Sequence, residues 1–206
     1  DGGNSLQDLS HLRKGNLVAK QWIAIVLAAG RGPNDPMAKA YCVSHKCALP
    51  VNGVPMLQRV VDALRQSRSV AAISISIEDP AIVLAALAKQ DPGISIMASE
   101  RSAPLSAIVA IRKHATYPVL LTTADHALLT PGMIDYFCGE AGRNGADFSA
   151  GLARAETVLA AYPQSVRTFF RLGRDRVSGC NLFAIGNENG LRILEKWQYL
   201  EQSRKK

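Results

Sequence analysis

Short apolar segments alternate with segments of helical periodicity along most of the chain. In residues 54–66, for example, Leu57, Val60, Val61 and Leu64 recur at the spacing that places side chains on one face of a helix. The same pattern predicts helices over residues 54–66, 79–90, 103–114 and 131–139, and from about residue 189 to the C-terminus. Apolar runs predict strands over residues 23–27, 71–77, 94–97, 117–123, 147–152 and 177–185.

Strands that alternate with helices imply βαβ units, in which neighbouring strands run parallel. Continuous apolar strands are typical of a sheet that is covered on both faces. We therefore predict an α/β fold of three layers, with a Rossmann-like, mainly parallel, twisted sheet and helices on both faces. Ligands of such sheets bind beyond the carboxyl ends of the strands, so chemistry is expected there.

Length and composition favour one globular domain, because the chain has 206 residues, of which 48% are apolar and 20% charged. Residues 1–20 are polar and lack strong periodicity. We interpret them as a flexible leader or a cloning remnant, and residues 21–206 as the single domain. No apolar run reaches the roughly 18 residues of a membrane span, and no export signal opens the chain.

Four cysteines are present, and no pair has the CxxC spacing of a zinc or redox site. Without an export signal we expect reduced thiols in a cytoplasmic protein. Cys138 and Cys180 are expected to fill core space, and Cys42 and Cys47 to lie in a loop and be partly exposed.

The chain is basic, with a formal net charge of +7 and a pI near 9.4. Cationic residues are spread along the sequence, and aromatic residues make up 6%, too few for an obvious base-stacking platform. Positive potential also concentrates small anions. We therefore favour phosphorylated small molecules over nucleic acid as partners.

A glycine-rich turn follows the first predicted strand, in Leu27-Ala28-Ala29-Gly30-Arg31-Gly32. Gly30 and Gly32 let the backbone approach a ligand, and backbone N–H groups in such a turn bind anions. Arg31 adds a fork of donors that suits phosphate. The segment matches neither the Walker loop nor the GxGxxG fingerprint. From composition alone, a flexible turn without a ligand is as well supported as an anion-binding turn.

Lys46 lies beyond this turn, before Ala-Leu-Pro-Val, and GVPMLQRVVDAL follows over residues 53–64. Together with LAAGRG and Met37, these segments resemble the signature of the MobA-like nucleotidyltransferases. That family includes molybdenum-cofactor nucleotidyltransferases, sugar-1-phosphate nucleotidyltransferases and methylerythritol-phosphate cytidylyltransferases. The resemblance covers about residues 22–66 and implies a fold of the nucleotide-diphospho-sugar transferase type.

The resemblance also implies roles for single residues. The turn formed by Leu27, Ala28, Ala29, Gly30 and Gly32 would bind the nucleoside triphosphate, and Lys46 would contact the reacting phosphate.

Two departures from the family pattern stand out in this region. Asp35-Pro36 replaces the family's arginine before Met37, which leaves Arg31 to supply that charge. The proline before the family's lysine is His45 here.

Asp125 ends the apolar strand at residues 117–123. Mg²⁺ prefers few carboxylates together with phosphate oxygens and water, so a lone carboxylate facing the glycine turn is chemically well placed. A role as helix cap is less favoured, because Thr130 and Pro131 already start the next helix. The segment also resembles the family's metal-binding strand end. His126 is not expected to be catalytic.

Two further residues gain candidate roles from the resemblance. Ser106 lies in a segment that resembles the family's loop for base and ribose, although simple N-capping by Ser102 or Ser106 remains open. Asn181 occupies a Gly-bearing strand, where an Asn marks a turn or bulge. In the sugar-nucleotide branch a similar segment supplies a second metal contact. No late acidic motif follows it, so either Asn181 serves or a C-terminal part of the fold is lacking.

Together these observations predict an Mg²⁺-dependent nucleotidyltransferase. It would transfer a nucleoside monophosphate from CTP or GTP to a phosphorylated small molecule and release pyrophosphate, with Lys46, Arg31 and Asp125 as catalytic residues. Five arginines before Asn181 could bind an acidic acceptor: Arg154, Arg167, Arg171, Arg174 and Arg176. A homo-oligomer is left open. The alternatives are a GT-A-like glycosyltransferase and a noncatalytic binder of nucleotides or nucleic acid.

Overall fold

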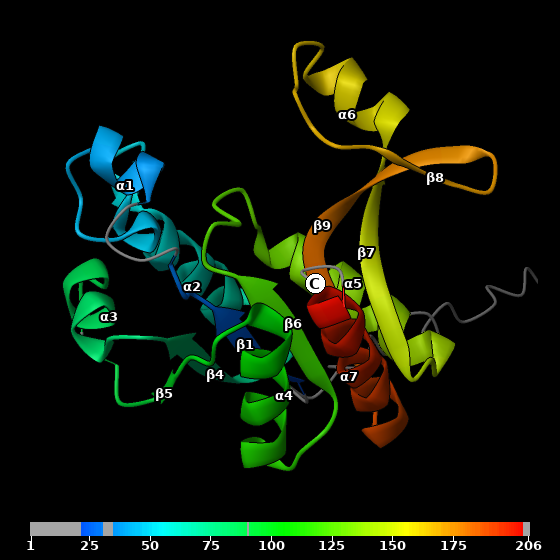
Figure 1. Ribbon diagram of the computed structural model, residues 1–206, viewed down its shortest axis with the longest axis horizontal. Helices are drawn as coiled ribbons and strands as arrows, with labels where there is room; N and C mark the ends of the chain where they lie inside the picture. Colours follow the sequence, from blue (N-terminus) through cyan, green and yellow to red (C-terminus); the bar gives the residue numbers. More distant parts are fainter. Residues whose placement is uncertain (1–21, 31–34, 90, 204–206) are drawn as a thin grey trace, which may run out of the picture.

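The computed structural model describes residues 22–30, 35–89 and 91–203. Within these residues, seven strands form one sheet in the order β5-β4-β1-β6-β9-β7, and β8 pairs with β9 (Figure 1). Strands β5, β4, β1 and β6 are parallel, whereas β9 is antiparallel to both β6 and β7. The bounds are β1 Trp22–Leu27, β4 Val70–Ile77, β5 Ile94–Ala98, β6 Val119–Thr123, β7 Phe148–Arg154, β8 Phe170–Leu172 and β9 Asp175–Ile185.

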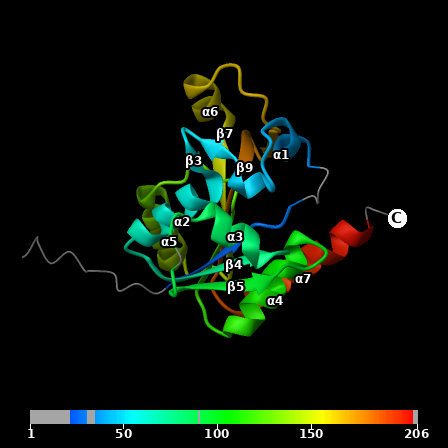
Figure 2. The same ribbon diagram turned by 90° about the vertical axis from the view of Figure 1, so that its left-hand side faces the viewer.

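Helices cover both faces of the sheet, as Figures 1 and 2 show. Along β1, Ala24 and Val26 belong to one hydrophobic cluster and Ile25 to another, because successive side chains of a strand point to opposite faces. The first cluster includes residues of α2 (Met56–Gln66), α3 (Pro80–Ala86) and α5 (Pro131–Asn144). The second includes residues of α4 (Ala103–His114) and α7 (Glu188–Ser203). The predicted three-layer, mainly parallel α/β fold is confirmed.

Three of these helices have a proline at the first or second helical position, after a side-chain cap. Asp79, Ser102 and Thr130 accept hydrogen bonds from backbone N–H groups in the first turns of α3, α4 and α5. The N–H groups of the first turn have no partner within the helix, and a proline there has no N–H to leave unpaired, so it suits these starts. The predicted ends were less accurate. The helix predicted over 79–90 ends at Ala86, and the one predicted to end at 139 continues to Asn144, before Gly145 at a φ of 59°.

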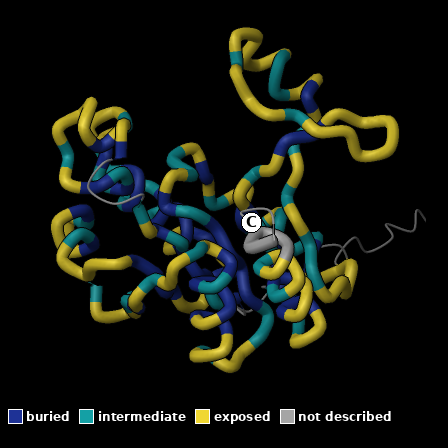
Figure 3. Tube along the Cα trace, in the orientation of Figure 1, coloured by how far each residue is buried: buried dark blue, intermediate teal, exposed yellow. Residues whose placement is uncertain are grey.

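Several short elements were not predicted, because they are too short to show a periodicity. They are α1 (Pro36–Ala40), the 3₁₀ helix η2 (Lys46–Ala48), the strands β2 (Pro50–Val51) and β3 (Val54–Pro55), and α6 (Ala155–Ala161), with β8. In Figure 1, α6, β8 and the adjoining ends of β7 and β9 project from the body as an arm. Most of the arm is exposed (Figure 3).

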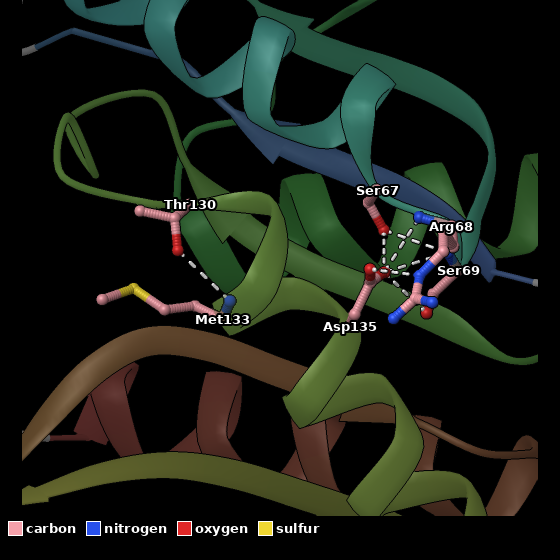
Figure 4. Close-up of polar contacts among 6 residues, drawn as sticks. All are labelled: Ser67, Arg68, Ser69, Thr130, Met133 and Asp135. Carbon is pink, nitrogen blue, oxygen red and sulfur yellow. Dashed lines mark hydrogen bonds and ion pairs between the residues drawn. The ribbon is translucent and has the colours of Figure 1, made fainter.

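Asp135 of α5 fastens that helix to the turn between α2 and β4 (Figure 4). Its Oδ1 accepts hydrogen bonds from Ser67 Oγ at 2.6 Å, from Arg68 N at 2.9 Å and from Ser69 Oγ at 3.0 Å. Although burial alone would raise the pKa of Asp135, hydrogen bonds from Ser67, Ser69 and Arg68 hold it below its ordinary value. This contact joins two segments that lie 68 residues apart.

All four cysteines are free thiols. Cys138 is buried and Cys42 exposed, in agreement with the predictions. Cys47 is buried rather than partly exposed, because η2 turns it into the core cluster on the α2 face. Cys180 is only half-buried. In the part of the chain that the structure describes, no helix has the length and apolar character needed to cross a membrane. The prediction for residues 1–20 lies outside the described residues.

Candidate active site

A cavity with a volume of about 510 Å³ lies at the carboxyl ends of β1, β4 and β6. This is the edge of a parallel sheet where ligands are expected. Its lining residues come from five segments far apart in the sequence: residues 27–30, 45–47, 76, 100–106 and 123–125. They include Leu27, Ala28, Ala29, Gly30, Lys46, Ser106 and Asp125, seven of the residues that sequence analysis proposed as ligands. Arg31 and Gly32 lie outside the described residues.

Lys46 and Asp125 meet in this cavity, although 79 residues separate them in the sequence. Lys46 Nζ lies 2.6 Å from Asp125 Oδ2, and the side chains are 32% and 36% exposed. Lys46 is placed by η2, and Asp125 follows the end of β6 by two residues. Asp125 Oδ1 accepts a second hydrogen bond, from Thr123 Oγ1 at 2.6 Å.

Asp125 is ionised at neutral pH. Burial would raise its pKa, but hydrogen bonds from Lys46 and Thr123 hold the pKa below its ordinary value. The described residues contain no group of three or more His, Cys, Asp or Glu side chains that could hold a metal ion without a further ligand. One ionised carboxylate opening into a cavity fits Mg²⁺, which completes its shell with phosphate oxygens and water.

Asn181 is not among the described residues that line the cavity. It is exposed, has a φ of 52° and lies at an irregularity where β7 and β9 change register, as predicted for an Asn in this strand. The register of β6 and β9 ends at Thr122 and Leu182, so Asn181 lies beside the carboxyl end of β6. Its role in metal binding stays a prediction.

The glycine turn is anchored to the sheet on both sides. Ala28 N donates to Ser76 O, and Leu27 O accepts from Ala124 N, each at 2.9 Å. Gly30 is needed at its position because a Cβ there would lie 2.4 Å from His45 Nε2. The Gly30 N–H points at the Glu78 carboxylate, whose oxygens lie 3.2 and 3.3 Å away.

His45 and Glu78 were not proposed as site residues from the sequence. The His45 ring is buried and starts η2, since its Nδ1 accepts a hydrogen bond from Cys47 N at 3.1 Å. Glu78 directly follows β4. One signal in the sequence could have identified Glu78. It directly follows a predicted strand, and ligands bind at the carboxyl ends of the strands in such a sheet. Burial, with the nearby charge of Glu78, raises the pKa of the Cys47 thiol to about 12, so this thiol is not a nucleophile at neutral pH.

Ser106 lies in the first turns of α4 and is only 3% exposed. Its Oγ accepts a hydrogen bond from Glu100 N at 2.8 Å, which holds the loop before α4 against the cavity. The helix cap itself is Ser102, whose Oγ accepts from Leu105 N. The capping alternative therefore applies to Ser102, and Ser106 shapes the cavity wall.

The predicted arginine group lies on the arm or at its base and is exposed. Arg167 Nη2 donates a hydrogen bond to Gly179 O at 2.8 Å, and Arg154 Nη2 lies 4.0 Å from Asp175 Oδ2. Arg171 of β8 lies opposite Arg176 of β9 in the register of the two strands.

His126 has a pKa below its ordinary value. Burial lowers the pKa, the charge of Asp125 raises it, and the charge of Arg167 also lowers it. The expectation that His126 is not catalytic stays a prediction.

Comparison with known proteins identifies the family and related folds. Residues 24–176 match the family model of the MobA-like NTP transferase domain. A hypothetical transferase from Thermus thermophilus is similar in structure, with a TM-score of 0.64 and 25% identity over 81% of this chain. The chain spans 65% of the length of that protein. Comparison with curated protein sequences finds no significant match.

Two further solved structures share the fold. One is CMP:2-keto-3-deoxy-manno-octonic acid synthetase complexed with CTP, with a TM-score of 0.61 and 17% identity; the match covers 90% of this chain and 85% of that one. The other is 4-diphosphocytidyl-2C-methyl-D-erythritol synthase from Anaerococcus prevotii, with a TM-score of 0.61 and 14% identity. That match covers 89% of this chain and 78% of the other.

Proposed function

Because the chain belongs to the family of MobA-like NTP transferase domains, we propose that it transfers a nucleoside monophosphate from a nucleoside triphosphate to a phosphorylated small molecule. Pyrophosphate is the second product. The observation that carries the proposal is the meeting of Lys46 and Asp125 in one cavity beside the Gly30 turn. A cation and a backbone donor bind phosphate oxygens, and an ionised carboxylate beside them would hold the Mg²⁺ that accompanies a polyphosphate.

In the proposed reaction an oxygen of the acceptor phosphate attacks the α-phosphorus in line with the leaving pyrophosphate. Such a step depends on positioning and on neutralising charge, and it needs no protein nucleophile. Lys46 exchanges its contact with Asp125 for a phosphate oxygen and follows the charge that develops there. Asp125 is the residue that would hold Mg²⁺, which supplies charge neutralisation on the phosphates when bound.

The remaining roles are assigned by position. Leu27, Ala28, Ala29 and Gly30 form the wall against the triphosphate, and Ser106 sets the loop that faces base and ribose. Arg31 and Gly32, which follow Gly30 in the sequence, are assigned to the triphosphate as well. Asn181, beside the end of β6, is assigned as the second metal contact.

CTP is the first nucleotide to test, because a structure with the same fold was solved with CTP; GTP is the alternative. The acceptor carries phosphate in this proposal, since the exposed arginines of the arm offer donors for it. A GT-A-like glycosyltransferase would need a second acid near Asp125, where His126 and Ala127 stand instead.

A screen for pyrophosphate release tests the proposal. Four NTPs are combined with a panel of sugar phosphates, polyol phosphates and pterin phosphates, with and without Mg²⁺. We expect release only when one NTP, one acceptor and Mg²⁺ are present together. Absence of release in every combination, with salt-sensitive binding to DNA or RNA in its place, would contradict the proposal and favour a nucleic-acid binder.

A further inference from the structure

A carboxylate lies against the glycine turn. Both oxygens of Glu78 lie within 3.3 Å of the Gly30 N–H, which is the backbone donor of the turn that opens into the cavity. A carboxylate oxygen and a phosphate oxygen make the same kind of hydrogen bond to a backbone N–H. In the free protein, therefore, this donor already contacts an anionic side chain of the same protein.

A second donor is aimed at the same place. The Nδ1 of His45 accepts from Cys47 N, so in the neutral ring the proton is on Nε2. The His45 side chain is only 7% exposed, and its Nε2 has no hydrogen-bond partner of regular geometry, although Glu78 Oε1 lies 3.2 Å away. Buried ring nitrogens are normally satisfied, so an unsatisfied one facing a cavity needs an explanation.

The position of Nε2 supplies that explanation. A Cβ built on Gly30 would lie 2.4 Å from it, so the ring stands directly against the glycine turn. His45 stands where the resembling family has proline, and Asp35-Pro36 stand where it has arginine. A ring donor at this point adds to the turn a contact that a proline could not make.

We propose that Gly30 N and His45 Nε2 form one phosphate subsite, which the Glu78 carboxylate fills in the free protein and an incoming polyphosphate takes over. The inference rests on the proposed function. Glu78 is free to leave, because its side chain is 40% exposed and the residue follows the last residue of β4. Its negative charge opposes the ligand until it moves, so Glu78 lowers nucleotide affinity and His45 raises it.

The test measures binding of inorganic tripolyphosphate, CTP and GTP to the full chain by calorimetry. Glu78→Gln keeps the shape and removes the charge. We expect it to bind tripolyphosphate about three- to tenfold more tightly than the unchanged chain. Glu100→Gln is the matched control, since it removes one charge from the same cavity without a contact to Gly30. Its effect should be less than half as large.

The His45 variants test the donor. Asn at position 45 can still accept from Cys47 N but has no atom at Nε2, so His45→Asn should bind tripolyphosphate about tenfold more weakly. Gln at position 45 can place an amide nitrogen near the Nε2 position and should restore most of the affinity. Unchanged unfolding midpoints establish that the variants are folded. If His45→Asn does not fold, Glu78→Gln decides alone.

The outcomes separate the two proposals. Pyrophosphate release by the unchanged chain, with binding unaltered in Glu78→Gln and His45→Asn, would overturn the inference and leave the proposed function standing. Weaker binding in Glu78→Gln would mean that Glu78 contacts the ligand instead of competing with it, and it would overturn the inference too. If the unchanged chain binds none of the three probes, both proposals fail.

Discussion

Replacing Asp125 by Asn separates a role in chemistry from a role in stability. The Asn keeps an oxygen for the Thr123 hydroxyl, but it offers no charge to Lys46 or to a metal. In the folded protein the change removes one ion pair, whose two side chains are each about a third exposed. Such pairs contribute only about 0.2–1 kcal/mol to stability because water screens them.

The expected loss in turnover is much larger than that. Removing one charged group that stabilises the transition state costs roughly 10²–10³ in kcat, or about 3–4 kcal/mol. Asp125→Asn should therefore lower kcat by at least about a hundredfold while shifting the unfolding midpoint by less than about 4 °C. Lys46→Met should behave in the same way. Because the two side chains act on one phosphate, the double variant should be little slower than either single variant.

Steady-state pyrophosphate release at saturating nucleotide measures kcat, and thermal unfolding of the same preparations gives the midpoint. Retention of more than a tenth of kcat in Asp125→Asn would refute the reasoning. So would single losses in Asp125→Asn and Lys46→Met that multiply in the double variant, since independent effects would show that the two groups do not act on the same phosphate.

Three further predictions concern the walls of the site and the frame of the fold. Asp135→Ala should lower the free energy of unfolding by about 2–3 kcal/mol in denaturant titrations at neutral pH. Folding lowers the pKa of Asp135, so its contribution to stability is fully present above the unfolded pKa of about 3.9. As the pH falls from there through the lower folded pKa, this contribution should disappear. The free energies of unfolding of the two proteins should therefore converge in acid. Ser106→Ala leaves the Glu100 N–H without its partner, so stability should fall by about 1–3 kcal/mol and the nucleotide KM should rise. Gly30→Ala forces the His45 ring aside, so nucleotide KM should rise at least about tenfold, and an unchanged KM would contradict the close approach.

Much of the site was predictable because its chemistry is carried by short segments at strand ends. Asp125 and the Gly30 turn each follow an apolar run directly, and the sheet rule brings such ends together. The His45–Glu78 contact could not be predicted in this way. It depends on η2, three residues long, which turns the ring of His45 inward, and nothing in the pattern around residues 38–48 predicts that turn.

In the outer part of the sheet, too, one feature was predictable from the sequence and another was not. The apolar run over 177–185 predicted a strand, but its antiparallel pairing with β6 on one side and β7 on the other has no local signal. The placement of Asn181 outside the cavity wall follows from that pairing and from the irregularity in register beside Ala150. The bent backbone at Asn181 was predictable from the sequence, whereas the distance of Asn181 from the site was not.

By itself the sequence determined the alternation of strands and helices, the two apolar faces and the position of Asp125 at the end of a strand. These follow from local periodicity and from residue chemistry, which each segment carries on its own. Only the tertiary structure decided that the Lys46 ammonium lies 2.6 Å from the Asp125 carboxylate, and that Glu78 rests on the Gly30 amide. Contacts across 79 and 48 residues depend on how the layers pack together, and no single segment contains that information.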